Sequence, residues 1–212
     1  MKILVLRFSS IGDIVLTSPV LRCLKKQVAD AEIHFATKSV FADLVKFNPN
    51  VTKVQELDED INALIAKLKP EKFDVVIDLH NNLRTARIKR GLGVPSHSFP
   101  KLNVEKWLLV NLKWDRMPKI HIVDRYLSAV ASLGVKNDGA GLDFFIPQER
   151  AVKLSDLPTT HQNGYTALAI GAAHVTKRLP EHRWIELVQM IEGPLVLIGG
   201  EDDVRIARGI AN

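Results

Sequence analysis

The 212-residue chain has little cysteine, few aromatic residues and no long apolar run. Its single cysteine, Cys23, excludes an internal disulfide and a cysteine-rich zinc site. No apolar run approaches the roughly 18 residues that a membrane-spanning helix needs. Arg7 interrupts the first apolar run, Ile3–Leu6, too early for a secretory signal peptide. We therefore expect a protein of the reducing cytoplasm.

Composition excludes wholesale disorder, because 46% of the residues are hydrophobic and 25% are charged. The net charge of +5 is unevenly spread: residues 84–125 hold ten basic residues and only three acidic ones. The ten are Arg84, Arg87, Lys89, Arg90, Lys101, Lys106, Lys113, Arg116, Lys119 and Arg125. Such a field suits a phosphorylated glycolipid, an anionic membrane surface or nucleic acid. A merely solvated basic face is the alternative.

Short apolar runs alternate with helical patterns along the first two thirds of the chain. The runs predict buried strands at residues 2–8, 32–37, 51–57 and 73–79. Helices are expected at residues 12–28, 39–47, 58–68, 83–90, 104–112 and 120–133, the last ending at Gly134. In the first of these, Pro19 either kinks the helix or begins its second part after an N-cap at Ser18. This alternation predicts an α/β fold with a parallel sheet covered on both faces.

The alternation of apolar runs and helical patterns stops at residues 135–163. This stretch is polar and contains several glycine and proline residues, which is typical of a linker. A second alternation then predicts strands at 165–170 and 195–198 around a helix at 180–191. We expect a first domain at 1–150, a linker at 151–163 and the first part of a second domain at 164–212. The first domain should be the better packed of the two.

The loop Arg7–Asp13 leaves the first predicted strand and enters a helix. It has one glycine, Gly12, where a Gly-x-Gly-x-x-Gly fingerprint needs three, and no Gly-Lys-Ser/Thr follows. Nicotinamide dehydrogenases and P-loop hydrolases are thereby disfavoured. Asp13 falls at the carboxyl end of the strand, where ligands bind in open α/β sheets and a carboxylate can act as a base. Alternatively, Asp13 only stabilises the helix N-terminus.

Three further segments join a strand end to a helix. Residues 78–84 carry a polar cluster that should face the same crevice as Asp13, or cap a helix. Residues 171–180 place Lys177 just before a helix, an arrangement suited to a diphosphate. Residues 199–203 carry carboxylates that could accept hydrogen bonds from ribose hydroxyls. Alternatively, they are only the acidic residues that favour the first turn of a helix. The seven histidines show no metal-ligand spacing, so we expect no metal.

Together these segments resemble glycosyltransferase family 9, the ADP-heptose:lipopolysaccharide heptosyltransferases. The matching pieces are residues 3–13, 78–84, 123–126, 177–180 and 197–200. The resemblance implies a GT-B fold: a Rossmann-like acceptor-binding domain with a parallel sheet, followed by a Rossmann-like domain that binds the nucleotide-sugar. It also implies inverting transfer of a heptose from ADP-heptose to an inner-core lipopolysaccharide or lipid A precursor, without cofactor or metal.

The resemblance assigns roles to particular residues. Asp13 would be the catalytic base. The acceptor would contact Ser9, Ser10, Gly12, His80, Asn81, Arg84, Arg87 and Arg125. The donor would contact Thr176, Lys177, Gly199, Gly200, Glu201, Asp202 and Asp203.

The sequence also departs from the family. Ala172 and Ala173 stand where relatives often carry hydroxyl residues, and a later glycine-containing diphosphate loop does not occur before Asn212. We therefore expect these 212 residues alone to be inactive, and the donor to be ADP-heptose or a related nucleotide-sugar. The enzyme should work at the inner face of the inner membrane, without binding nucleic acid. Another GT-B glycosyltransferase and a non-catalytic polyanion-binding module are the alternatives.

Overall fold

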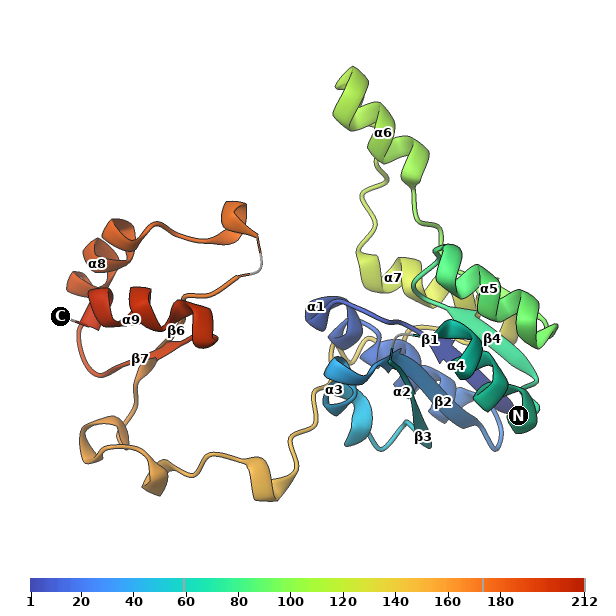
Figure 1. Ribbon diagram of the computed structural model, residues 1–212, viewed down its shortest axis with the longest axis horizontal. Coiled ribbons are helices and arrows are strands. Elements are labelled where there is room, and N and C mark those ends of the chain that lie inside the picture. Colours follow the sequence, from blue (N-terminus) through green and yellow to red (C-terminus); the bar gives the residue numbers. More distant parts are fainter. Residues whose placement is uncertain (59, 173, 212) are drawn as a thin grey trace. The chain divides into compact units, whose positions relative to one another are not determined.

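The computed structural model describes residues 1–58, 60–172 and 174–211. The chain divides into two compact units, Met1–Pro147 and Gln148–Asn212 (Figure 1). No helix in the described ranges is both long enough and apolar enough to cross a bilayer.

A five-stranded sheet forms the centre of the first unit, and all its strand pairs are parallel. Its strands are β1 (Lys2–Leu6), β2 (Glu32–Lys38), β3 (Lys53–Leu57), β4 (Val75–Asp78) and β5 (Ser96–Ser98). The spatial order is β3-β2-β1-β4-β5, so the chain builds outward from β1 in one direction and then continues from β4 in the other. The strand order therefore reverses between β1 and β4, and such a switch point is where open α/β sheets bind ligands.

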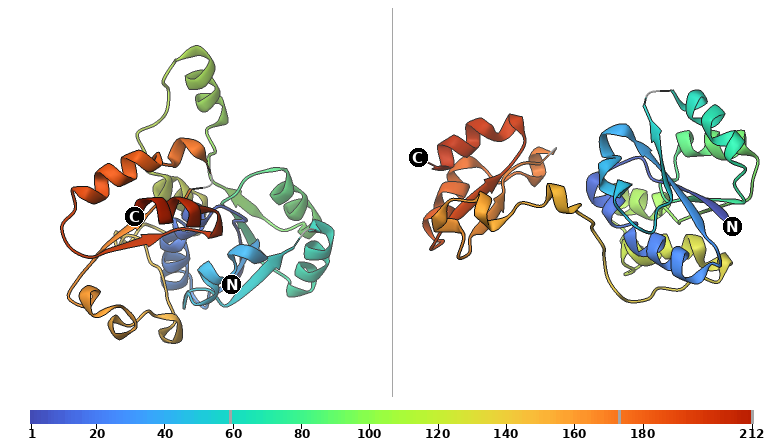
Figure 2. Two further views of the ribbon diagram at one scale, coloured as in Figure 1. Left: turned by 60° about the vertical axis from the view of Figure 1, so that its left-hand side comes forward. Right: turned by 90° about the horizontal axis from the view of Figure 1, so that it is seen from below.

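Helices cover both faces of this sheet (Figure 2). They are α1 (Ile11–Val15), α2 (Ser18–Gln27), α3 (Asp43–Lys46), α4 (Ile61–Leu68), α5 (Leu83–Leu92) and α7 (Ile122–Leu127). Successive β1 side chains point to opposite faces. Ile3 and Val5 therefore pack with α2, α3 and α7, whereas Leu4 and Leu6 pack with α4 and α5. This arrangement confirms the predicted α/β fold with a covered parallel sheet.

Helix boundaries differ in detail from the sequence prediction. The helix expected from Gly12 to Val28 is broken into α1 and α2, and Thr17, not Ser18, is the N-cap of α2. Pro19 lies in the first turn of α2, where its missing N–H has no intrahelical partner to lose. The helix expected from Asp58 begins at Ile61, because the Asp60 side chain accepts a hydrogen bond from Asn62 N and caps it.

Residues 135–147, the first part of the stretch punctuated by glycine and proline, belong to the first unit. Arg22 of α2 forms ion pairs with Asp138 at 2.7 Å and with Asp143. It also donates a hydrogen bond to the Gly141 carbonyl at 2.9 Å. These contacts fasten the end of the unit to α2 although the partners lie far apart in the sequence.

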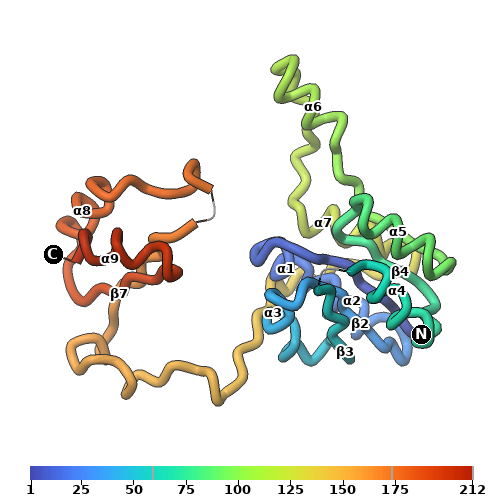
Figure 3. Tube along the Cα trace, viewed as in Figure 1, coloured from blue at the N-terminus to red at the C-terminus, as the bar shows by residue number. Residues whose placement is uncertain are grey.

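The second unit contains a two-stranded parallel sheet of β6 (Thr166–Ala169) and β7 (Leu195–Ile198), with α8 (Glu181–Gln189) and α9 (Val204–Ala211). Figure 3 traces the connection from Pro147 to β6, which contains three short 3₁₀ turns. Ile170 and Ile210 are the buried apolar residues among the described part of this unit. The apolar core of the chain thus lies mainly in the first unit.

Candidate functional site

The carboxyl ends of β1 and β4 lie side by side, with Leu6 paired to Asp78 in the parallel register. The loop after β1 leads into α1, and the loop after β4 leads into α5. The peptide between Ser9 and Ser10 in the first loop is cis. The topology thus brings Asp13 and His80 to the switch point of the sheet, where the sequence placed both.

Asp13 is held by its own loop. Its Oδ2 lies 2.5 Å from a guanidinium nitrogen of Arg7 and accepts a hydrogen bond from Ser10 Oγ at 3.0 Å. Partial burial opposes ionisation, but the charge of Arg7 and the hydrogen bonds from Ser10 outweigh it, and the pKa of Asp13 falls below its ordinary value of 3.8. The side chain is 37% exposed. Asp13 is therefore an ionised carboxylate that solvent or a substrate can reach at neutral pH.

Arg7 connects the ends of β1 and β4, a role that was not predicted from the sequence. Its side chain is buried and donates a hydrogen bond to the Leu79 carbonyl at 2.6 Å, which joins the two strand ends. Its guanidinium also lies 5.6 Å from the ring centroid of Tyr126, a buried residue of α7. Burial raises the pKa of the Tyr126 hydroxyl, which stays protonated at neutral pH. In the sequence, this role is indicated only by the position of Arg7, a cationic residue directly after a buried strand.

His80 packs edge-on against Phe8, with ring centroids 5.5 Å apart. Burial, together with the nearby positive charges of Arg7 and Lys101, lowers the pKa of His80 to about 4. Its Nδ1 is buried and has no hydrogen-bond partner among the residues that the structure describes. His80 is thus a neutral imidazole beside Asp13 at neutral pH.

The loop after β4 is fixed by the fully buried Asp78. Its Oδ1 accepts hydrogen bonds from the backbone nitrogens of His80 at 3.0 Å and Asn81 at 2.7 Å. Its Oδ2 pairs with Lys89 at 2.8 Å. Asn81 has a left-handed φ of 51° and donates its side-chain amide to the Phe99 carbonyl. Asp78 therefore acts as a support for the site, a function that the sequence motif alone did not reveal.

The three arginines predicted to bind the acceptor fall into two groups. Arg125 donates hydrogen bonds to the Pro100 carbonyl, and the neighbouring Lys101 donates to the Asn81 carbonyl at 3.2 Å, so this group adjoins the site loop. Arg84 and Arg87 of α5 lie toward α4: Arg84 lines a hollow together with Ile61, and Arg87 donates a hydrogen bond to Asn62 Oδ1.

Ser9 is partly exposed, and Ser10 and Gly12 are exposed. A Cβ added at Gly12 would have no heavy atom within 4 Å. Open space therefore lies over the turn that enters α1, beside Asp13.

The predicted donor residues lie in the second unit, around the ends of β6 and β7. Asp203 is buried, and its Oδ2 accepts a hydrogen bond from Gly200 N at 2.9 Å. A Cβ on Gly171 would lie 2.0 Å from that oxygen, so only glycine fits there without displacing Asp203. Asp203 thus points into the unit and joins the two loops.

The other predicted donor residues are on the surface. Thr176 and Lys177 lie exposed in a 3₁₀ turn, Val175–Lys177, before α8. The exposed set also includes Gly199, Gly200, Glu201 and Asp202. Ala173 lies outside the described residues. A lysine, a hydroxyl and two carboxylates are thus exposed in the loops that follow β6 and β7.

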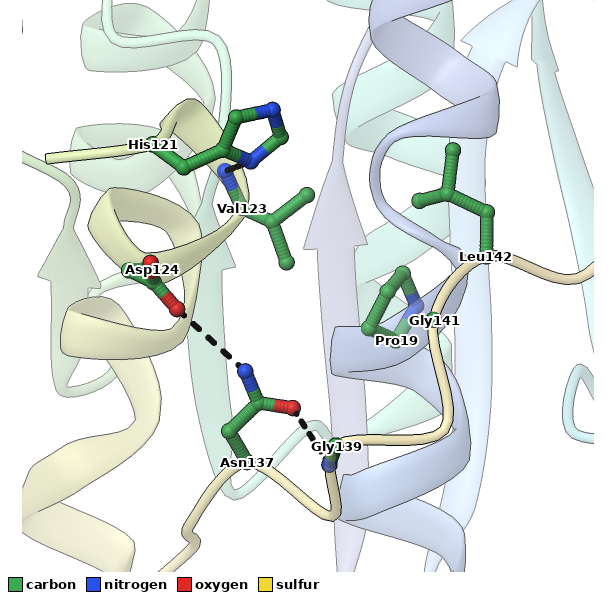
Figure 4. A pocket seen from close by; sticks show the side chains of 8 residues that line it. All are labelled: Pro19, His121, Val123, Asp124, Asn137, Gly139, Gly141 and Leu142. Carbon is green, nitrogen blue, oxygen red and sulfur yellow. Dashed lines mark hydrogen bonds between the residues drawn. The ribbon is translucent and has the colours of Figure 1, made fainter.

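A separate pocket of the first unit lies between α2, α7 and residues 137–142 (Figure 4). Its polar groups bond to one another: Asn137 donates to Asp124 at 3.2 Å and accepts from Gly139 N at 3.0 Å. Because these groups already bond to one another, they are less available to a ligand than the carboxylate of Asp13. Within the described ranges, no cluster of three or more His, Cys, Asp or Glu side chains is arranged to hold a metal ion.

Comparison with known proteins supplies the family. The sequence profile of glycosyltransferase family 9 (heptosyltransferase) matches residues 61–212. Lipopolysaccharide heptosyltransferase 1 of Campylobacter coli is 28% identical over 112 residues, which are 50% of this chain and 33% of that protein. The aligned part thus spans about a third of that curated relative's length.

Solved structures agree on the fold. A family 9 glycosyl transferase from Veillonella parvula is 21% identical, with a TM-score of 0.73 over 99% of this chain and 66% of that one. E. coli heptosyltransferase WaaC with ADP-2-deoxy-2-fluoro heptose is 21% identical, with a TM-score of 0.74 over 100% of this chain and 73% of that one. These similarities confirm the GT-B type of α/β fold. Because the family profile covers most of the sequence, the chain belongs to glycosyltransferase family 9, the heptosyltransferase family.

Proposed function

We propose that this protein transfers a heptose from ADP-heptose to an inner-core sugar of a lipopolysaccharide precursor, with inversion at the anomeric carbon. Family membership supports the reaction class. A similar fold that was solved with an ADP-heptose analogue supports the donor. The observation that carries the proposal is the ionised, reachable Asp13 carboxylate at the switch point of the first sheet.

Asp13 is the general base in this proposal. The acceptor hydroxyl oxygen attacks the anomeric carbon of the heptose, and its proton passes to Asp13 Oδ1 or Oδ2. The bond between the anomeric carbon and the diphosphate oxygen breaks at the same time, and ADP leaves with the electron pair. Attack opposite to the leaving group inverts the configuration. Arg7 fixes the carboxylate and keeps it ionised, and a base positioned in this way contributes about 10²–10⁴-fold in rate.

The acceptor binds over the two loops of the first unit. Ser9, Ser10 and Gly12 offer hydroxyls and open space, and neutral His80 and Asn81 offer ring and amide groups to sugar hydroxyls. Arg125 lies beside the site loop and is the best placed of the three arginines to meet an acidic group. Arg84 and Arg87 contact acidic groups further out, toward α4.

The donor binds at the ends of β6 and β7. Lys177 neutralises negative charge on the leaving diphosphate, and the Thr176 hydroxyl donates a hydrogen bond to a diphosphate oxygen. Glu201 and Asp202 accept hydrogen bonds from the ribose. Asp203 is too deeply buried for that contact, and we assign it the role of positioning Gly200 near the diphosphate, with Gly199 beside it.

The test is a transfer assay with the full-length protein, a heptose-free lipopolysaccharide core and one nucleotide-sugar at a time. We expect the acceptor to gain the mass of one heptose from ADP-heptose, with an inverted anomeric configuration by NMR. UDP-glucose and ADP-glucose are the control donors. Transfer from either control donor at the rate seen with ADP-heptose would contradict the donor assignment, and absence of any transfer would contradict the proposed reaction.

A charge variant tests the acceptor side separately. Arg125→Met should raise the acceptor KM and weaken its dependence on salt, because one cation beside the acceptor is lost. The donor KM should not change. Glu186→Gln, which alters an exposed ion pair with Arg183 in the second unit, is the control. If Arg125→Met raises only the donor KM, the assignment of acceptor to the first unit is wrong.

A further inference from the structure

Residues 101–120, which we call the α6 hairpin, project away from the first unit (Figures 1 and 2). The hairpin contains α6 (Asn103–Leu112), and none of the residues of this helix is buried. Val104 is 69% exposed, Trp107 57% and Val110 66%. The remaining large apolar residues of the hairpin that are exposed are Leu109, Leu112, Trp114 and Ile120.

An exposed helix of this composition needs a partner. Apolar side chains occur all around α6, as in helices that are buried or lie in a membrane. A helix of ten residues is also too short to be stable in water by itself. Contiguous exposed apolar patches of this kind mark binding surfaces.

Charge indicates what the partner is. The hairpin holds the basic residues Lys101, Lys106, Lys113, Arg116 and Lys119 against the acidic Glu105 and Asp115. The Arg116 guanidinium lies 3.8 Å from the ring centroid of Trp114, so a cation and an aromatic ring share one exposed position. Tryptophan together with lysine and arginine is typical of helices that lie in the interface of an anionic bilayer.

We propose that the α6 hairpin binds the surface of an anionic lipid bilayer. Trp107, Val104 and Val110 enter the boundary between headgroups and acyl chains, and the lysines meet the lipid phosphates. At 1.5 Å per residue, α6 is about 15 Å long, too short to span a hydrocarbon core of about 30 Å, so it lies in the interface.

A second copy of the chain fits this surface less well. In a two-fold dimer the same patch meets itself, and each net-positive hairpin would then face another. An anionic bilayer instead offers both the apolar medium and the opposite charge.

The base of the hairpin is joined to the site of the first unit. Lys101 Nζ donates a hydrogen bond to the Asn81 carbonyl, and Arg125 donates to the carbonyl of Pro100, the residue before the hairpin. Docking of the hairpin would therefore bring the loop that carries His80 close to the lipid surface. The proposal itself rests on the hairpin and stands whether or not the protein transfers heptose.

The experiment is co-sedimentation of the protein with vesicles of phosphatidylglycerol and phosphatidylcholine, and with vesicles of phosphatidylcholine alone. We expect binding to the anionic vesicles that weakens as salt rises. Trp107→Ser together with Val110→Ser should lower the partition coefficient at least about tenfold. Lys106→Gln together with Lys113→Gln should lower it about tenfold on anionic vesicles only.

Matched controls distinguish binding through the hairpin from non-specific binding through other exposed apolar or basic side chains. Met190→Ser removes an apolar side chain of the second unit that is 80% exposed, and Lys67→Gln removes an exposed lysine of α4. Both should bind vesicles like the unaltered protein. In a Trp184→Phe background, fluorescence from Trp107 and Trp114 should shift to the blue when vesicles are added, which reports burial of the hairpin itself.

Three outcomes would overturn the proposal. The first is equal vesicle binding by the hairpin variants and the controls. The second is absence of vesicle binding by the unaltered protein. The third is a dimer in analytical ultracentrifugation that Trp107→Ser with Val110→Ser converts to a monomer, without any vesicle binding, which would identify a second copy as the partner.

Discussion

Replacing Arg7 with methionine removes the guanidinium but keeps most of the apolar stem in the first unit. Besides the contact with the Tyr126 ring, two polar contacts are lost: the hydrogen bond to the Leu79 carbonyl at 2.6 Å and the ion pair with Asp13 at 2.5 Å. A buried carbonyl left without its charged donor costs about 1–3 kcal/mol. The ion pair adds only about 0–1 kcal/mol, because the Asp13 side chain is 37% exposed and solvent screens it. We expect the free energy of unfolding to fall by about 1–4 kcal/mol.

The loss should also depend on pH. In the unaltered protein the pKa of Asp13 lies below its ordinary value of 3.8, so its ionisation stabilises the fold above that pH. This stabilisation disappears as the pH falls through the lowered pKa. Without Arg7, only the hydrogen bonds from Ser10 counteract the rise in pKa that burial causes, so the pKa of Asp13 is higher than in the unaltered protein. The difference in stability between the two proteins should therefore grow as the pH rises through the region around 3.8.

Urea unfolding followed by circular dichroism over a pH series measures both effects. Arg87→Met is the matched control, because Arg87 is exposed and its hydrogen bond, to Asn62 at 3.1 Å, lies on the surface. Its effect should stay within about 0.5 kcal/mol at every pH. An Arg7→Met protein as stable as this control, or one whose loss does not vary with pH, would refute the role assigned to Arg7.

Three other substitutions test separate parts of the structure. Gly171→Ala should lower the stability of the second unit by about 1–3 kcal/mol in thermal unfolding, because the new Cβ would collide with Asp203; an unchanged midpoint would contradict that packing. Arg22→Met should lower the free energy of unfolding at neutral pH, because it removes the cation that pairs with Asp138 and Asp143 and the donor to the Gly141 carbonyl. Hydrogen bonding to Arg22 lowers the pKa of Asp138, so this cost should shrink in acid, and a cost that is constant with pH would count against the ion pair. Lys177→Met should raise the donor KM about tenfold, with the acceptor KM unchanged; equal changes in both would argue against a diphosphate contact.

Local signals were sufficient to predict the central strands and the place of Asp13. β1 and β4 are continuous apolar runs, and each is followed by a polar loop and a helix. Parallel strands bring their carboxyl ends to one edge, so Asp13 and His80 could be placed together from the sequence alone. By contrast, β5 (Ser96–Ser98) is short and polar, and only its pairing with β4 defines it as a strand.

Contacts between distant residues explain what the sequence did not reveal. Residues 135–147 carry the glycines of a linker, yet Asp138 and Asp143 bind Arg22 on α2. The role of Arg7 likewise depends on Leu79, which belongs to another strand end. The exposure of α6 was also hidden, because its helical pattern resembles that of a buried helix.

The most direct test of the central claim is kcat of Asp13→Asn in heptosyl transfer by the full-length protein. Asparagine keeps the size of the side chain and its hydrogen bond from Ser10 but cannot take the proton from the acceptor. Asp74→Asn makes the same chemical change at the opposite end of β1, where Asp74 accepts a hydrogen bond from Lys2 N at 2.6 Å. We predict that Asp13→Asn lowers kcat by about 10²–10⁴-fold with little change in donor affinity, and that Asp74→Asn leaves kcat unchanged. A near-native kcat for Asp13→Asn would contradict the assignment of the base.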